Sequence, residues 1–371
     1  MSDPPRRQVA LAIPGRPSWR RDRVIRAFQL IGLPVLAVGM VGWTIVTAHR
    51  QGELAIDFKN VSPEIRGLVH GVNPFVVENV GQGGHFLWTV LAGWLLSPFA
   101  WLPYGYLLVV ALEVAGVVVA ALLLGVRDWR LIALALAWPA TTNSVQTANI
   151  TVLTTVLLAA AWHDRDRTRA GLWAGLAVGV KVFAWPALFW LAATRRWRAL
   201  FVALGIQVFA LLITLPYMSL GDYVRFEREV DQVMSGQAIT LDALVRDLGG
   251  SPTLGRAVAL IVGLAVLWKG RRDLGWVVVA MLVLSPVVWL HYFGLLLIPL
   301  ALWSSSLLVW CIPLLLFLVP GLRNGETWQT ALALGVLAVA PGAAWIRSGR
   351  EAEEAGIWRS PAYSGAGPPS T

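Results

Sequence analysis

The sequence predicts an all-α membrane protein that crosses the bilayer several times. Of its 371 residues, 57% are hydrophobic and only 14% are charged, and the mean hydropathy of +0.65 is far above that of a soluble protein. Apolar stretches long enough to span a bilayer recur between short basic segments. The single cysteine, Cys311, lies in an apolar segment, so the chain has neither a disulfide framework nor a thiolate metal cage.

Short basic clusters predict how the chain is oriented, because cytoplasmic loops carry an excess of Lys and Arg. Six arginines lie within residues 1–23, ahead of the first span, which we expect at 27–48, so residues 1–23 should form a basic cytoplasmic segment. Further basic clusters, also expected in the cytoplasm, lie at 126–130, 163–169, 195–198 and 269–273. Since these clusters separate apolar segments, topology explains the net charge of +9 better than nucleic-acid binding does.

The remaining elements follow the same plan within a transmembrane domain at 24–346. Two outer loops are expected, at 50–85 and at 219–254, and acids outnumber arginines in the second. An amphipathic segment at 85–103 should lie along the outer interface or partly within it. The tail at 347–371 is expected to be cytoplasmic and disordered. The other predicted spans lie near 104–125, 199–218, 255–268, 274–290, 291–303, 304–321 and 328–346.

Two intervals between basic clusters are too short for two full spans. The stretches 129–163 and 169–195 each have room for two helices of about 12–15 residues, whereas crossing needs about 20. We therefore predict that each interval enters from the cytoplasm, turns at partial depth and returns. Turns at membrane depth are tolerated only where they line protein or water. The predicted turns at 141–149 and 178–186 would form the floor of a deep, outward-facing cavity.

Several polar residues are candidates for function, and each also has a plainer interpretation. Asp57 follows the first span and is either functional or an ordinary acid at a helix end. Lys181 interrupts an apolar helix end in a chain with only three lysines, which favours function because a charge there is costly. His291 would lie near the outer end of a span, as an interfacial histidine or a donor to an anion. Glu113, well inside a span, needs a polar partner that helix packing alone could supply.

Motifs of soluble enzymes are absent from the sequence: it contains no P-loop, no GxSxG and no HExxH. The 20 tryptophans are typical of aromatic belts at the two membrane interfaces, and some could also stack on sugar rings.

The order of several segments resembles glycosyltransferase family 87. An acid just after the first span is followed by "RGLVHGVNPF", "LSPFAWLP", "NSVQTANITVLTTVLLAAA", "AGLWAGLAVGVKVFAWPALFWLAATRRWRAL" and "LSPVVWLHYFGLLLIPL". The resemblance covers roughly residues 24–345. The chain departs from the family at one point, since it reads "GGHFLWTV" where relatives usually carry a Tyr-Pro-Pro element.

The resemblance implies a C-type glycosyltransferase fold, with about 10–13 transmembrane or partly inserted helices and an outward-facing cavity. It implies that Asp57 is the catalytic base and that Lys181 and His291 lie near the donor phosphate. Lys59 and Arg66 are candidates for substrate binding, although interfacial anchoring is the favoured interpretation of both. The other candidates for substrate binding are His85, Asn143, Gln146 and Asn149, and for the last three, capping and hydrogen bonds between helices are the favoured interpretation.

The function implied is transfer of a sugar, first of all mannose, from a polyprenyl phosphate to a glycolipid or cell-envelope glycan. Transfer would proceed with inversion at the outer face of a bacterial plasma membrane, with both termini in the cytoplasm. The sequence requires no cofactor and no metal, although a divalent cation could share the work of Lys181 and His291. Three alternatives remain open: an arabinofuranose donor, a lipid or solute transporter, and a non-catalytic scaffold for envelope assembly.

Overall fold

The computed structural model describes residues 28–76, 88–235, 238–320 and 325–354. All regular elements in these ranges are helices, which confirms the predicted all-α class. Those of the N-terminal half are η1 (Phe28–Gly32), α2 (Leu33–Arg50), α3 (Ile56–Val69), α4 (Val90–Trp101), α5 (Gly105–Leu123), α6 (Trp129–Ala137), α7 (Pro139–Thr147), α8 (Thr151–His163) and α9 (Ala170–Val180). They are followed by η3 (Val182–Ala184), α10 (Pro186–Ala193), α11 (Trp197–Thr214), α12 (Leu220–Met234), α13 (Leu241–Asp247), α14 (Pro252–Gly270), α15 (Leu274–Leu284), η5 (Leu290–Leu296), α16 (Leu297–Trp303), α17 (Leu307–Cys311), η6 (Ile312–Leu318) and α18 (Thr327–Glu354).

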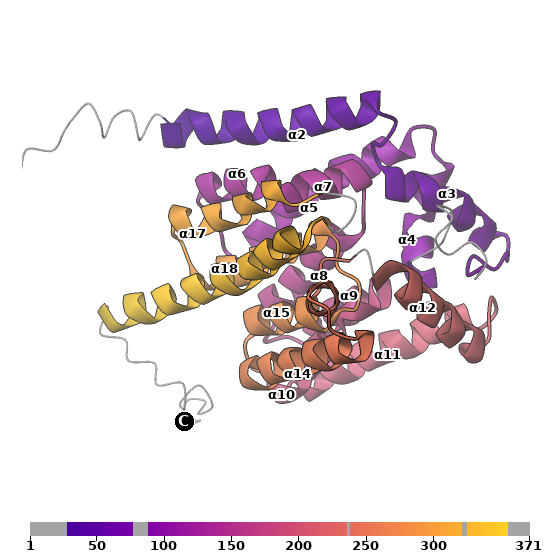
Figure 1. The fold of residues 1–371 in the computed structure, drawn as a ribbon. Coiled ribbons are helices and arrows are strands. Elements are labelled where there is room, and N and C mark those ends of the chain that lie inside the picture. Colours follow the sequence, from indigo (N-terminus) through magenta and orange to yellow (C-terminus); the bar gives the residue numbers. More distant parts are fainter. Residues whose placement is uncertain (1–27, 77–87, 236–237, 321–324, 355–371) are drawn as a thin grey trace, which may run out of the picture.

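Long apolar helices are interspersed with shorter helices along the described chain. Those long and apolar enough to cross a membrane are Phe28–Arg50, Gly105–Leu123, Trp197–Thr214, Pro252–Gly270 and Thr327–Gly349. Their exposed faces are strongly apolar, as membrane-facing surfaces must be. Figure 1 shows α2 along one edge of the molecule and α3, α4 and α12 gathered at one end. The chain is therefore a multi-pass membrane protein, as predicted.

The short helices predicted between the basic clusters are present, but one predicted turn was wrong. Residues 141–147 are not a turn: they belong to α7, so 129–163 holds three helices rather than two. Pro139 starts α7 because its fixed φ suits a first helical position. Ala148 ends it in the left-handed conformation, with φ 51°. The second turn was predicted correctly, since α9 ends at Val180 and α10 begins at Pro186.

Two other predicted elements differ from the structure. The span expected at 274–290 is helical only to Leu284, because the chain becomes extended at Ser285 and the next residue is Pro286. The segment at 85–103 contains α4, whose exposed face carries Trp94, Leu95 and Trp101. This helix is therefore apolar on both faces rather than amphipathic. Its place relative to the interface stays a prediction.

Close packing of α9 against α11 fixes the position of the chain that follows α9. Gly171, Gly175 and Gly179 recur at intervals of four, so they share one face of α9. A Cβ on Gly171 or Gly175 would meet the backbone of Ala199 or Ala203 on α11. Small residues at this spacing let membrane helices approach closely. Lys181, the residue directly after α9, is thereby held in a fixed position relative to α11.

We expect Gly175→Val to disrupt this helix pair. Its Cβ would lie 2.9 Å from the Cα of Ala203, and overpacking of this kind costs about 1–3 kcal/mol. The thermal unfolding midpoint of the purified protein in detergent should fall. Gly205→Val on α11 is the matched control, because a Cβ there meets nothing within 4 Å. Equal unfolding midpoints for the two variants would show that the close approach of α9 and α11 does not contribute to stability.

Candidate active site

Asp57 lies in the first turn of α3, directly after the first span. Phe58, Ile65 and Leu68 are almost fully buried and fix the face that α3 turns toward the core. The carboxylate is half-buried and accepts a hydrogen bond of 2.7 Å from the Nδ2 of Asn149. An acid in a first turn also suits the positive end of the helix dipole. Asp57 is thus held toward the turn between α7 and α8, far away in the sequence.

Asn149 joins the acid of α3 to the lysine that follows α9. While its Nδ2 donates to Asp57, its Oδ1 accepts from the Nζ of Lys181 at 2.7 Å and from the hydroxyl of Thr151 at 2.9 Å. The same ammonium also donates to the Oγ1 of Thr151 at 2.7 Å. These partners fix the orientation of the Asn149 amide. A carboxylate and an ammonium are therefore bridged by one side chain.

Lys181 is a buried cation at the break between α9 and η3. The chain becomes extended there, with φ −146°, and the side chain is only 9% exposed. Its Nζ lies 3.8 Å from the centre of the Tyr292 ring, a geometry that stabilises a cation over an aromatic face. A buried cation persists only when it has partners, and Lys181 has Asn149, Thr151 and Tyr292.

Two left-handed alanines lie beside this hydrogen-bonded chain. Ala55 has φ 57° just before α3, and Ala148 has φ 51° just before Asn149. The amide of Ala55 donates to the carbonyl of Gln146 at 2.6 Å, so the two strained turns are tied together. Non-glycine residues in this region cost of order 1–3 kcal/mol and gather at functional sites. The two left-handed residues thus lie in the two segments that carry Asp57 and Asn149.

His291 lies beside the lysine, in η5. It is 3% exposed, and its Nδ1 lies 3.3 Å from the Oδ1 of Asn143 on α7. Its Nε2 is buried with no hydrogen-bond partner in the described structure. The ring centre is 5.0 Å from that of Tyr292, which in turn packs under Lys181. Both predicted phosphate-binding residues therefore flank the same tyrosine.

The pKa of Asp57 is raised above its ordinary value. Burial is the main cause, because it disfavours the charged form. The hydrogen bond from Asn149 and the positive charge of Lys181 oppose the increase. An acid with a raised pKa is a stronger base once it is ionised.

A cavity of about 300 Å³ opens beside Lys181. Lys181 and Tyr292 form part of its wall, and Trp88, Trp185 and Trp289 supply flat aromatic surface. Asp57 and His291 do not line this cavity. Asp57 is connected to it by the hydrogen bonds between Asp57 and Asn149 and between Asn149 and Lys181, which does line it. The cavity thus combines a buried cation with the aromatic faces that sugar rings use for stacking.

Comparison with known protein families decides the class of the protein. The family model described as glycosyltransferase family 87 matches residues 86–318, more than half of the chain. The chain belongs to glycosyltransferase family 87. No curated protein and no solved structure matches it. The protein is therefore a membrane glycosyltransferase.

The match to family 87 contains most of the candidate site but not its acid. Asn149, Lys181 and His291 lie within 86–318, whereas Asp57 precedes the match. Only the fold brings Asp57 to the matched part, through its bond to Asn149. The geometry thus connects an acid outside the match to polar residues within it.

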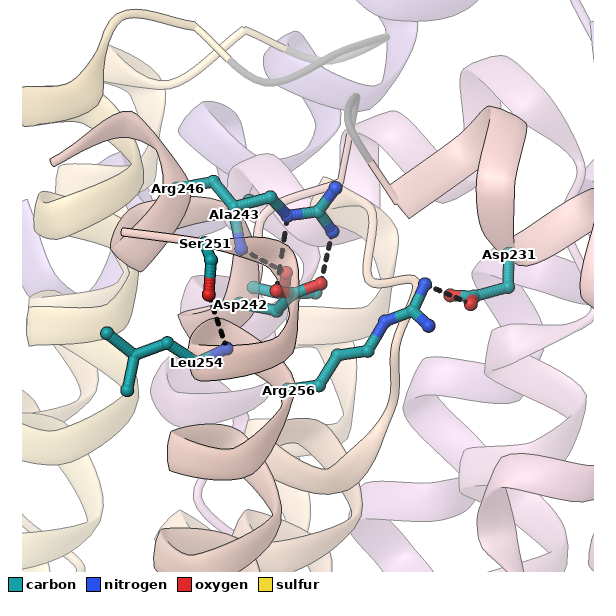
Figure 2. Close-up of polar contacts among 8 residues, drawn as sticks. Asp231, Asp242, Ala243, Arg246, Ser251, Leu254 and Arg256 are labelled. Carbon is teal, nitrogen blue, oxygen red and sulfur yellow. Dashed lines mark hydrogen bonds and ion pairs between the residues drawn. The ribbon is translucent and has the colours of Figure 1, made fainter. Parts of the chain in front are cut away.

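In this glycosyltransferase, α12 forms part of the wall of the same cavity, and one ion pair ties it to α14. Tyr223, Glu227 and Asp231 line the cavity from α12. Figure 2 shows Asp231 paired with Arg256, near the start of α14. The same figure shows a second pair within α13, between Asp242 and Arg246, and Ser251 capping α14 through the amide of Leu254.

Three further candidates for substrate binding, Lys59, Arg66 and Gln146, do not line the cavity, and each makes a contact that supports the fold. The Nζ of Lys59 lies 4.4 Å from the ring centre of Tyr106, and Arg66 donates to the carbonyl of Ala100 at 3.0 Å. The side chain of Gln146 donates to Glu53 at 2.8 Å. His85 lies outside the described residues. Anchoring and inter-helix bonding, the plainer interpretations, account for these contacts.

The sequence did not single out three other residues near the site: Thr151, Tyr292 and the left-handed Ala148. Tyr292 follows the candidate His291 directly, which is the only signal that pointed to it. Glu113 is buried on α5 within electrostatic range of Lys181 and Asp57. Among the described residues, no group of three or more His, Cys, Asp or Glu could hold a metal ion.

Proposed function

We propose that this glycosyltransferase transfers a sugar, mannose in the first instance, from a polyprenyl phosphate to a glycolipid or cell-envelope glycan. The observation that carries the proposal is the chain Asp57–Asn149–Lys181, in which a base and a cation are held on two sides of one amide. Lys181 faces a cavity with aromatic walls, which suits a sugar phosphate. The orientation we propose places this cavity outside a bacterial plasma membrane and both termini in the cytoplasm.

The proposed reaction needs one base and one stabilised leaving group. The acceptor hydroxyl attacks the anomeric carbon and passes its proton to the carboxylate of Asp57. The bond between the anomeric carbon and the phosphate oxygen breaks, and its electron pair leaves with the polyprenyl phosphate. Lys181, with His291 beside it, stabilises the negative charge on this phosphate. Direct displacement inverts the anomeric configuration.

An apolar cavity next to the first one supports a lipid donor. It has a volume of about 170 Å³ and shares Thr89, Val182 and Tyr223 with the cavity beside Lys181. Most of its other lining residues are apolar, among them Leu211 on α11 and Leu215 directly after that helix. Because α11 is also one of the long apolar helices, a polyprenyl chain could enter from the bilayer while its phosphate reaches Lys181.

The proposal is tested by supplying different donors to the purified protein. Polyprenyl-phosphate mannose, polyprenyl-phosphate arabinofuranose and a nucleotide-linked mannose would each be offered with a mixture of membrane glycolipids as acceptors. We expect radiolabelled mannose to move from the polyprenyl donor only, with inversion seen by NMR. Transfer from polyprenyl-phosphate arabinofuranose alone would change the proposed sugar to arabinofuranose and leave the proposed mechanism intact. Transfer from the nucleotide-linked mannose alone, or from none of the three donors, would overturn the proposed donor.

Asn149→Ala should shift the pH dependence of transfer. Asp57 works as a base only when it is ionised, so kcat/KM falls as the pH drops below its pKa. The hydrogen bond from Asn149 lowers this pKa. Its removal should therefore move the acidic limb of the pH profile of kcat/KM to higher pH. Gln146→Ala is the matched control from the same region, because that side chain bonds Glu53 instead. If the acidic limb of Asn149→Ala is not shifted, the pKa of Asp57 does not control the rate of transfer.

A further inference from the structure

A third cavity lies away from the cavity beside Lys181 and the apolar cavity next to it, at the turn between α14 and α15. It has a volume of about 590 Å³ and is lined by Lys269, Arg271 and Arg272 together with Trp276 and Trp345. Figure 1 shows that the end of α14 that leads into α15 lies away from α3, α4 and α12. The candidate active site does not use this cavity, since the two share no lining residue.

The cations of this turn lack the acidic partners found at the other basic turns. Arg130 pairs with Asp128 at 2.6 Å, and Arg169 pairs with Asp164 at 2.6 Å. At 195–198, Arg196 pairs with Asp166 at 3.6 Å. Within the described chain, no ion pair involves the three cations at 269–272. The orientation rule explains why this turn is basic, but it does not explain why this is the only one of the four described basic turns whose cations form no ion pair.

The one acid of the turn is occupied by the start of α15. The carboxylate of Asp273 accepts from the amides of Gly275 and Trp276 at 2.8 and 3.4 Å. It also accepts from the indole of Trp303 at 3.2 Å. With its oxygens engaged in this way, Asp273 caps the helix rather than neutralising the cations beside it.

The surroundings of the cavity are those of a membrane surface. Trp276, Trp303 and Trp345 form a cluster with ring centres 5.1–5.9 Å apart. Trp268 on α14 is 62% exposed, and the guanidinium of Arg271 lies 4.5 Å from its ring centre. Tryptophans favour the level of the lipid head groups. The unpaired cations therefore lie where the apolar surface of α14 ends.

We propose that the α14–α15 turn binds a phosphate-bearing anion between Lys269, Arg271 and Arg272. Basic pockets between membrane helices are well suited to acidic lipid head groups. The exposed apolar face of α14, which includes Ile261 and Leu264, would accommodate an acyl chain below such a head group. A free phosphate compound offers the same chemistry without the chain, and the experiment separates these two sources.

Binding is measured with the full-length protein in neutral detergent. Dioleoylphosphatidylglycerol, dioleoylphosphatidylcholine and inorganic phosphate would be titrated separately, with the thermal unfolding midpoint as readout, because a ligand of the folded state raises it. We expect phosphatidylglycerol to raise the midpoint and phosphatidylcholine to leave it unchanged. R271Q/R272Q should weaken phosphatidylglycerol binding by roughly 10- to 30-fold. An equal effect of inorganic phosphate, lost in the same variant, would identify a soluble phosphate as the source.

Two further variants keep the result interpretable. Arg271 also donates to the carbonyl of Trp268, so K269Q/R272Q removes two charges without touching that bond. R195Q/R198Q removes two exposed arginines from another basic turn and should leave phosphatidylglycerol binding intact. Equal weakening in this control would show that overall charge, not the cavity, attracts the lipid, and would overturn the proposal. An unchanged affinity in both variants of the α14–α15 turn would also overturn it.

Discussion

Asp57→Asn should reduce sugar transfer by about 10²–10⁴-fold, the usual contribution of a general base. The amide keeps the size of the carboxylate but cannot accept the proton of the acceptor hydroxyl. Because the bond from the Nδ2 of Asn149 can still reach the side-chain oxygen, the local fold should persist. Initial rates of transfer from polyprenyl-phosphate mannose, with protein matched for unfolding midpoint, provide the measurement.

Asp247→Asn is the matched control for this experiment. Asp247 is an exposed acid at the end of α13 and lines neither the cavity beside Lys181 nor the apolar cavity next to it. Its replacement removes the same charge and should leave the rate unchanged. If Asp57→Asn transfers sugar as fast as the unaltered protein, Asp57 is not the base. Another acid near the site, Glu113 or Glu227, would then have to be tested.

Much of the architecture could be predicted because hydropathy and basic turns report directly on the membrane. The broken helices around Lys181 followed from the spacing between the clusters at 163–169 and 195–198. The register of 141–149 could not be predicted in this way, since its polar residues suggest a turn. In the structure all of these polar residues except Asn149 lie within α7, and most of them are buried against neighbouring helices. Tertiary burial overrode a local polar pattern.

The candidate site was predictable as a set of residues but not as an arrangement. Asp57 and Lys181 stand out as charges in apolar surroundings. Their connection through Asn149 depends on the left-handed conformations of Ala55 and Ala148, and alanine gives no sequence signal for that conformation. The phosphate roles of Lys181 and His291 stay predictions. What the structure adds is that both contact Tyr292.

Lys181→Gln should also abolish most transfer, by about 10²–10³-fold, because a pre-placed group that stabilises the leaving charge is lost. Lys59→Gln is the matched control: that lysine also lies over an aromatic ring, Tyr106, but lines neither the cavity beside Lys181 nor the apolar cavity next to it. We expect at most a few-fold effect. A normal rate in Lys181→Gln would remove the cation from the mechanism.

The pH profile of Lys181→Gln distinguishes a mechanistic role from a structural one. The positive charge of Lys181 lowers the pKa of Asp57, so its removal should move the acidic limb of kcat/KM to higher pH, as in Asn149→Ala. Only Lys181→Gln should also lose rate on the plateau above the limb, where Asp57 is fully ionised, because the leaving phosphate then lacks its cation. A shifted limb with a normal plateau would show that Lys181 tunes the base without touching the phosphate. A lowered plateau with an unshifted limb would place Lys181 at the phosphate and uncouple it from Asp57.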